Sequence, residues 1–135
     1  MFLLSGCAVF RTDPCEVHNV SSSLKITHDQ TICFETIDSY DLDHSGKRNI
    51  NIYGKLFFPK NKVKKYNAVI LSHGSGGVRR YHRKYVDLLV SNGYVVFQLD
   101  HYMGRGIRYD KTFSKVSGIT FMNDAYYALN LLRTH

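Results

Sequence analysis

Residues 69–77 read Val-Ile-Leu-Ser-His-Gly-Ser-Gly-Gly, a short apolar run that passes directly into a glycine-rich segment. The run begins at Ala68 and is continuous rather than alternating, which is typical of a parallel strand covered on both faces. Glycines after such a strand let the backbone turn its N–H groups toward a ligand, because no Cβ stands in the way. Two kinds of site use this arrangement, a dinucleotide-binding loop and an oxyanion hole.

The segments on either side of this stretch predict an α/β fold. Upstream, strands are expected at 31–37 and 49–58, and their spacing indicates an antiparallel pair. Downstream follow a helix at 79–92, a buried strand at 94–100, a glycine-containing loop and a helix at 120–134. Strands that alternate with helices favour a parallel sheet, so an antiparallel pair is expected to lead into a parallel sheet.

Both predicted helices have apolar side chains at helical spacing, and these stripes are expected to face the core. The stripes consist of Tyr81, Tyr85, Leu88 and Leu89 in the first helix, and of Met122, Ala125, Tyr126, Leu129 and Leu132 in the second. Asp124 lies beside the second stripe and is expected to be an exposed or capping residue.

The dinucleotide-binding interpretation rests on Gly74 and Gly76, with Asp100 at the end of the next strand as a ribose ligand. The third glycine of that motif would fall at position 79, where this chain has Arg79. That glycine allows close packing of helix on strand, so its loss weakens the interpretation. An antiparallel strand pair before the loop is also unusual for dinucleotide-binding domains.

The oxyanion-hole interpretation agrees with the position of the loop, because α/β-hydrolases place a His-Gly-rich segment after their third strand. Three further segments accompany it in order: Leu-Leu-Val-Ser-Asn-Gly-Tyr-Val-Val-Phe-Gln-Leu-Asp at 88–100, Gly-Arg-Gly at 104–106, and Asp-Ala-Tyr-Tyr-Ala-Leu at 124–129. With these segments, residues 48–135 resemble the N-terminal half of dienelactone hydrolases. The resemblance implies a three-layer α/β-hydrolase sandwich, present in part, and cleavage of ester or lactone bonds by covalent acyl transfer.

The same resemblance assigns roles to the loop. Backbone N–H groups of Gly74 and Ser75 are the implied oxyanion donors, and His73 is implied to support the loop. Arg105 is a candidate for binding a substrate carboxylate through two hydrogen bonds, with a structural anchor as the alternative.

Asp100 and His101 are expected to be structural. The acid of the triad follows the nucleophile in this fold, so Asp100 comes too early in the chain. Because no Ser or Cys lies in a Gly-x-Ser-x-Gly or Gly-x-Cys-x-Gly segment, we expect the nucleophile downstream of His135. We therefore expect the 135-residue chain alone to lack esterase activity. The non-enzymatic alternative is an envelope protein that keeps the hydrolase scaffold as a binding module.

The charge and cysteine content limit the partners. A net charge of +7 favours anionic partners. A solvated surface turn accounts for part of this charge, namely Lys60, Lys62, Lys64 and Lys65. No nucleic-acid-binding module is recognisable. The three cysteines lack metal-ligand spacing, and no metal or cofactor is expected. A small ester or lactone is the expected partner.

Residues 1–30 are expected to form a leader and polar linker before the domain at 31–135. Leu4-Ser5-Gly6-Cys7 resembles a bacterial lipobox, which would make Cys7 a lipid-attachment site. Only Phe2, Leu3 and Leu4 precede the small residues as an apolar stretch, so either the true start lies upstream or the match is accidental. The first case predicts a periplasmic or membrane-anchored lipoprotein, with a disulfide between Cys15 and Cys33. The second leaves a cytoplasmic protein.

Overall fold

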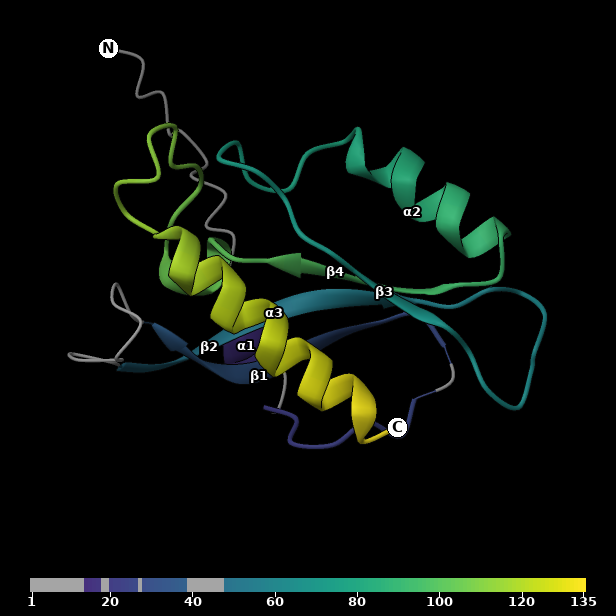
Figure 1. Cartoon of the computed structure of the whole chain (residues 1–135). Helices are drawn as coiled ribbons and strands as arrows, with labels where there is room; N and C mark the ends of the chain where they lie inside the picture. Colours follow the sequence, from purple (N-terminus) through teal and green to yellow (C-terminus); the bar gives the residue numbers. More distant parts are fainter. Residues whose placement is uncertain (1–13, 18–19, 27, 39–47) are drawn as a thin grey trace, which may run out of the picture.

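The computed structural model describes residues 14–17, 20–26, 28–38 and 48–135 (Figure 1). The strands and the two long helices follow the predicted order, and each boundary lies within three residues of the expected one. The short helix α1 was not expected. The elements are α1 (Pro14–Val17), β1 (Gln30–Asp38), β2 (Arg48–Phe57), β3 (Ala68–Leu71), α2 (His82–Ser91), β4 (Val95–Asp100), the 3-10 turn η1 (Met103–Arg105) and α3 (Gly118–Arg133).

The four strands form one mixed sheet in the order β1-β2-β4-β3. The β1–β2 and β2–β4 pairs are antiparallel, whereas β3 and β4 run parallel. The predicted strand pair and its parallel continuation are therefore confirmed. Because β3 and β4 are parallel neighbours, their carboxyl ends lie at the same edge of the sheet. Residues 72–77, which follow β3, are thus brought next to residues 101–106, which follow β4.

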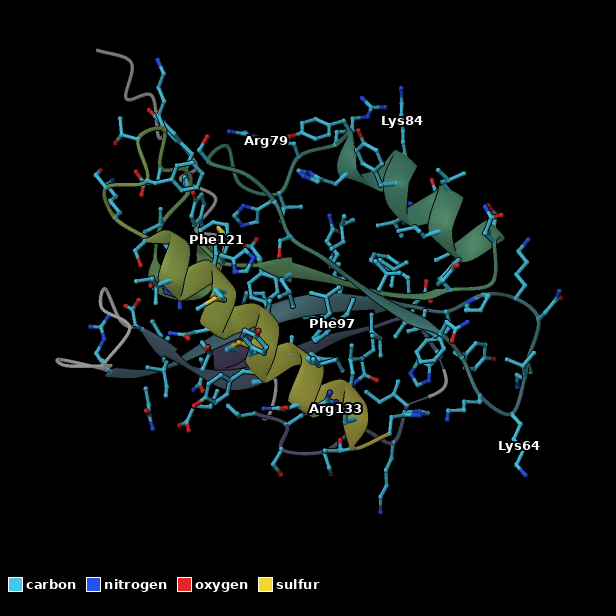
Figure 2. The ribbon with its side chains drawn as sticks, viewed as in Figure 1. Lys64, Arg79, Lys84, Phe97, Phe121 and Arg133 are labelled. Atoms are coloured by element: carbon cyan, nitrogen blue, oxygen red, sulfur yellow. A yellow bond between two sulfur atoms is a disulfide. The ribbon has the colours of Figure 1, made fainter. Side chains whose placement is uncertain are left out.

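Helices α2 and α3 cover opposite faces of this sheet (Figure 1). Successive side chains of β4 point to alternate faces. Val95 and Phe97 belong to a buried cluster with Leu131 of α3. Val96 and Val86 of α2 are also buried, but they do not belong to that cluster. Figure 2 shows Phe97 between α3 and the strands.

The buried face of α2 differs from the predicted one. Tyr81, Tyr85 and Leu88 are 54%, 55% and 60% exposed, while His82 and Val86 are buried. Each buried position follows an exposed one by a single residue, which is a rotation of about 100° around the helix. The periodicity located the helix correctly but gave the wrong orientation.

The prediction for α3 was right in part. Met122 and Tyr126 of the expected stripe are exposed, whereas Ala125 and Leu132 pack against the core. Asp124 has no exposed surface, so it is neither an exposed nor a capping residue. The cap is Ser117, whose side chain accepts the N–H of Thr120.

The described part of residues 1–30 is attached to the domain. Cys15 forms a disulfide with Cys33 of β1, with the two Cα atoms 5.5 Å apart. Leu24 is buried, and its N–H donates to Oγ1 of Thr134 at 2.9 Å. Residues 39–47, between β1 and β2, lie outside the described residues. Within the described ranges, no helix has the length and apolar character needed to cross a bilayer.

Candidate functional site

Residues 72–77 leave the carboxyl end of β3 and form a loop held by its carbonyl groups. The carbonyl of Gly74 accepts the N–H of Gly77 at 3.0 Å, and its oxygen lies 2.7 Å from Nδ1 of His73. The carbonyl of Ser75 accepts the N–H of Asp110 at 3.0 Å. Gly77 has a φ of +74°, which glycine adopts without steric cost. Both carbonyl groups are therefore tied back to the protein.

His73 is held in one tautomer by its two neighbours. Its Nε2 lies 3.1 Å from the backbone N–H of His101, which can only donate. The imidazole proton must then be on Nδ1, where it donates to the carbonyl of Gly74. Burial lowers the pKa of His73 to about 4, so the ring is neutral at pH 7. A neutral, buried ring keeps this pair of hydrogen bonds across the physiological pH range.

The held carbonyls determine where the next N–H groups point. In a trans peptide unit the C=O and N–H point in opposite directions, and no cis bond occurs in the described residues. The N–H groups of Ser75 and Gly76 thus point away from the donors that hold the carbonyls of Gly74 and Ser75. Neither N–H has a hydrogen-bond partner among the described residues. Two adjacent unpaired N–H groups are suited to stabilising a developing negative charge on oxygen.

These orientations extend the prediction made for the loop. Gly74 and Ser75 were the expected donors, and the geometry favours Ser75 and adds Gly76. Gly76 was not among the expected donors, because the sequence does not reveal which carbonyl groups are tied back. The role of each residue in a reaction remains a prediction.

Behind the loop lies a buried polar cluster around Asp124 of α3. Nδ1 of His101 lies 2.7 Å from Oδ2 of Asp124, and Nη1 and Nη2 of Arg105 donate to its two oxygens at 2.9 and 3.0 Å. Oγ1 of Thr36 donates to Oδ1 at 2.8 Å. The guanidinium compensates the buried charge and the hydrogen bonds occupy the oxygen lone pairs. These partners explain why α3 turns a polar face inward.

Comparison with known proteins agrees with this fold and site. A family model described as acetyl xylan esterase matches residues 12–124, which is most of the chain. The chain belongs to the acetyl xylan esterase family. No curated protein matches.

A solved structure of a protein assigned as a dienelactone hydrolase, from Klebsiella pneumoniae subsp. pneumoniae, matches with a TM-score of 0.52 and 22% identity. The match covers 78% of this chain and 45% of that chain, so this chain spans less than half of its length. At this identity the likeness shows the fold alone, and it confirms the predicted α/β-hydrolase architecture. The family assignment supports an esterase-type hydrolase, in agreement with the predicted class.

In this family member Arg105 lies inside the protein rather than at an open surface. Its side chain is 3% exposed, its Nη1 donates to the carbonyl of His101 at 2.7 Å, and its Nε lies 3.4 Å from Oδ1 of Asp38. With Asp124 these contacts occupy three sides of the guanidinium. The structure thus places Arg105 as an anchor, and a substrate carboxylate would have to displace a protein carboxylate to reach it.

The glycine next to Arg105 allows η1 to approach β2. A Cβ added to Gly104 would meet the carbonyl oxygen of Asn51 and would lie 2.9 Å from Cα of Ile52. Both neighbours are backbone atoms, which cannot rotate away. The absence of a side chain at position 104 therefore sets the depth at which Arg105 enters the cluster.

Asp100 has partners that account for its position without a ligand. Its Oδ1 accepts the N–H groups of Tyr102 and Met103 at 3.0 and 2.9 Å, and its Oδ2 lies 3.2 Å from the hydroxyl of Tyr53. It stabilises the turn after β4, as the structural interpretation predicts. A ribose hydroxyl would compete with these hydrogen bonds, which argues against the dinucleotide-binding alternative.

The remaining predicted features lie away from this loop or outside the described residues. Cys7 falls in the latter group, so its lipid attachment stays a prediction. The lysines at 60–65 are exposed, and Figure 2 shows Lys64 at the opposite end of the molecule from Arg79 and Phe121. Among the described residues, no group of three or more His, Cys, Asp or Glu side chains is placed to hold a metal ion.

Proposed function

We propose that this chain is the N-terminal half of an ester hydrolase in which the loop at 73–77 binds the oxyanion. The observation that carries the proposal is the pair of unpaired N–H groups on Ser75 and Gly76, held in place because the carbonyls of Gly74 and Ser75 are tied back. His73 supports the loop as a neutral hydrogen-bonded ring. Gly74 stays a third candidate donor.

The proposed reaction is covalent acyl transfer. A nucleophile attacks the ester carbonyl, and the oxygen that becomes negative is stabilised by the two N–H groups. Donors fixed before the reaction stabilise this charge without reorganisation, and each contributes roughly 10²- to 10³-fold in kcat. The 135 residues contain no Gly-x-Ser-x-Gly or Gly-x-Cys-x-Gly segment, so the proposal places the nucleophile beyond residue 135.

The first test is to sequence the source locus past codon 135 and upstream of Met1. A Gly-x-Ser-x-Gly or Gly-x-Cys-x-Gly segment within about 20 codons, followed by Asp and His, would support the enzyme. A stop codon directly after His135 would contradict the enzymatic proposal. It would favour the alternative of a scaffold that binds without catalysis.

The second test uses the complete protein and a matched pair of variants at Gly76. Gly76→Pro removes the N–H donor, and we expect kcat to fall roughly 10²- to 10³-fold with little change in KM. Gly76→Ala keeps the donor. An added Cβ would meet only Arg79, with Nε 3.5 Å away, so we expect nearly unchanged activity. Equal activity of the two variants would contradict an oxyanion role for Gly76.

The proposed substrate is a small ester or lactone, and the family description makes acetyl esters the first compounds to assay. We also infer an oxidising compartment, because the Cys15–Cys33 disulfide is typical of exported proteins. A lipid on Cys7 would add a membrane anchor. Mass spectrometry of protein alkylated in its native host tests both points, and free thiols at Cys15 and Cys33 would favour the cytoplasm.

A further inference from the structure

A serine, a histidine and an aspartate form a hydrogen-bonded chain at the carboxyl ends of β3 and β4. Oγ of Ser72 lies 3.1 Å from Nε2 of His101, and Nδ1 of His101 lies 2.7 Å from Oδ2 of Asp124. Both distances fall in the roughly 2.6–3.2 Å range expected between a nucleophile, its base and the group that orients the base. Ser72 was not predicted as a nucleophile, because it does not lie in a glycine-flanked nucleophile segment.

The proton positions along this chain follow from its fixed members. Asp124 already accepts hydrogen bonds from Arg105 and Thr36, so its carboxylate acts as an acceptor. Nδ1 of His101 must then carry the proton that bridges to Asp124. The lone pair of Nε2 consequently faces the hydroxyl of Ser72. This is the arrangement in which a histidine removes a serine proton while a carboxylate holds the ring.

The burial of the three residues differs in a way that suits a reaction. Ser72 is exposed to solvent, whereas the side chains of His101 and Asp124 have no exposed surface. Phe121 stacks on the ring of His101, with centroids 4.0 Å apart and planes 27° apart, and holds the ring in place. An electrophile can therefore reach Oγ of Ser72 while the base stays shielded and oriented.

One feature limits the reactivity of this serine. Arg105 binds both oxygens of Asp124, so the carboxylate stabilises a protonated His101 less than an unshared carboxylate would. Ser72 is consequently suited to activated acyl or phosphonyl compounds rather than to amides.

We propose that Ser72 is a nucleophilic site that accepts an acyl group from small activated esters. Oγ forms a bond to the carbonyl carbon as its proton passes to Nε2 of His101. The bond to the leaving oxygen then breaks, and that oxygen takes the proton from His101. Water attacks the acyl-serine with the same base and releases the acid. The site is separate from the oxyanion-loop proposal and revises the expectation that the 135-residue chain is inert.

The test treats the complete protein with a fluorophosphonate and locates each modified serine by peptide mass spectrometry. Ser91 is the internal control, since it is an exposed serine whose hydroxyl donates to the carbonyl of Leu88 and has no hydrogen bond to a histidine among the described residues. We expect Ser72 to be modified at least about 100-fold faster than Ser91, the usual size of a general-base effect. Equal modification of the two serines, or none at Ser72, would overturn the proposal without any variant being made.

Two variants then assign the base. His101→Asn retains an N–H that can donate to Asp124 but has no base facing Ser72, and we expect modification of Ser72 to slow by about 100-fold. Ser72→Ala should abolish modification at this peptide. A folded His101→Asn chain that reacts at the unaltered rate would show that His101 does not activate Ser72. If that variant does not fold, the comparison with Ser91 still decides the question.

Discussion

Helices α2 and α3 have similar apolar periodicity in sequence but meet the sheet differently. The side of α3 that faces the sheet includes Asp124, whereas Tyr126 remains 59% exposed. Along α2 the carboxylate of Asp87 lies in solvent, and Leu88 is 60% exposed. On α3 the inward face carries the carboxylate that a buried cation binds. Arg105 requires a carboxylate, and α3 supplies it.

The largest expected effect comes from removing that carboxylate. Asp124→Ala removes the bidentate partner of Arg105 and leaves only the longer contact with Asp38 at 3.4 Å, so we expect the free energy of unfolding to fall by about 3–5 kcal/mol. Urea titration followed by circular dichroism measures this loss. A loss below about 1 kcal/mol would mean that the cluster does not orient α3.

A second test compares one leucine from each helix. Leu131 of α3 is 6% exposed and lies in the main core cluster, so Leu131→Ala should lower the free energy of unfolding by about 2–5 kcal/mol. Leu88→Ala on α2 is the matched control, and its cost should stay within about 0.5 kcal/mol. Equal costs for the two leucines would contradict the difference in burial described above.

A third test uses pH and concerns His73, whose ring contacts Phe121 of α3. Burial lowers the pKa of His73 to about 4, from 6.5 in the unfolded chain. The unfolded chain therefore binds more protons between these values, and stability falls as pH drops from 6.5 to 4. The loss from this residue is on the order of 3 kcal/mol. Urea titrations across this range should show the slope in the native chain and a smaller slope in His73→Gln.

Asp110 contributes a second loss of stability, which occurs at lower pH than the loss from His73. Desolvation acts to raise the pKa of Asp110, but hydrogen bonds from the backbone N–H groups of Lys115, Val116 and Ser114 lower it overall to below 3.8. The stability that it contributes is lost only as pH falls through that depressed value. A slope confined to pH below 4 would thus contradict the assignment to His73.

The smallest expected effect completes the comparison of carboxylates. Asp87 pairs with Arg83 at 2.7 Å on the exposed face of α2, and both side chains are more than half exposed. Asp87→Ala should change the free energy of unfolding by only about 0.3–0.5 kcal/mol, and less in high salt. A change comparable to that of Asp124→Ala would show that burial is not the deciding variable.

The sequence predicted the elements better than their contacts. Strand and helix patterns are local signals, so the boundaries could be placed from neighbouring residues alone. The burial of Asp124 could not be predicted in this way, because its partner Arg105 lies 19 residues away in the sequence and Thr36 lies 88 residues away. The glycine loop was recognised from its composition. The orientation of its favoured donors depends on Asp110, whose N–H donates to the carbonyl of Ser75. The two residues are 35 positions apart in the sequence.

Gly104 illustrates how a residue without functional groups can resemble a catalytic one in scanning mutagenesis. Any side chain there would push η1 off the backbone of β2 and withdraw the guanidinium of Arg105 from Asp124. His101 would then lose the carboxylate that orients it, and its backbone N–H would shift beneath His73. A loss of activity at position 104 would thus report on the spacing between two pieces of backbone, transmitted to the loop at 73–77 that we propose as the oxyanion site.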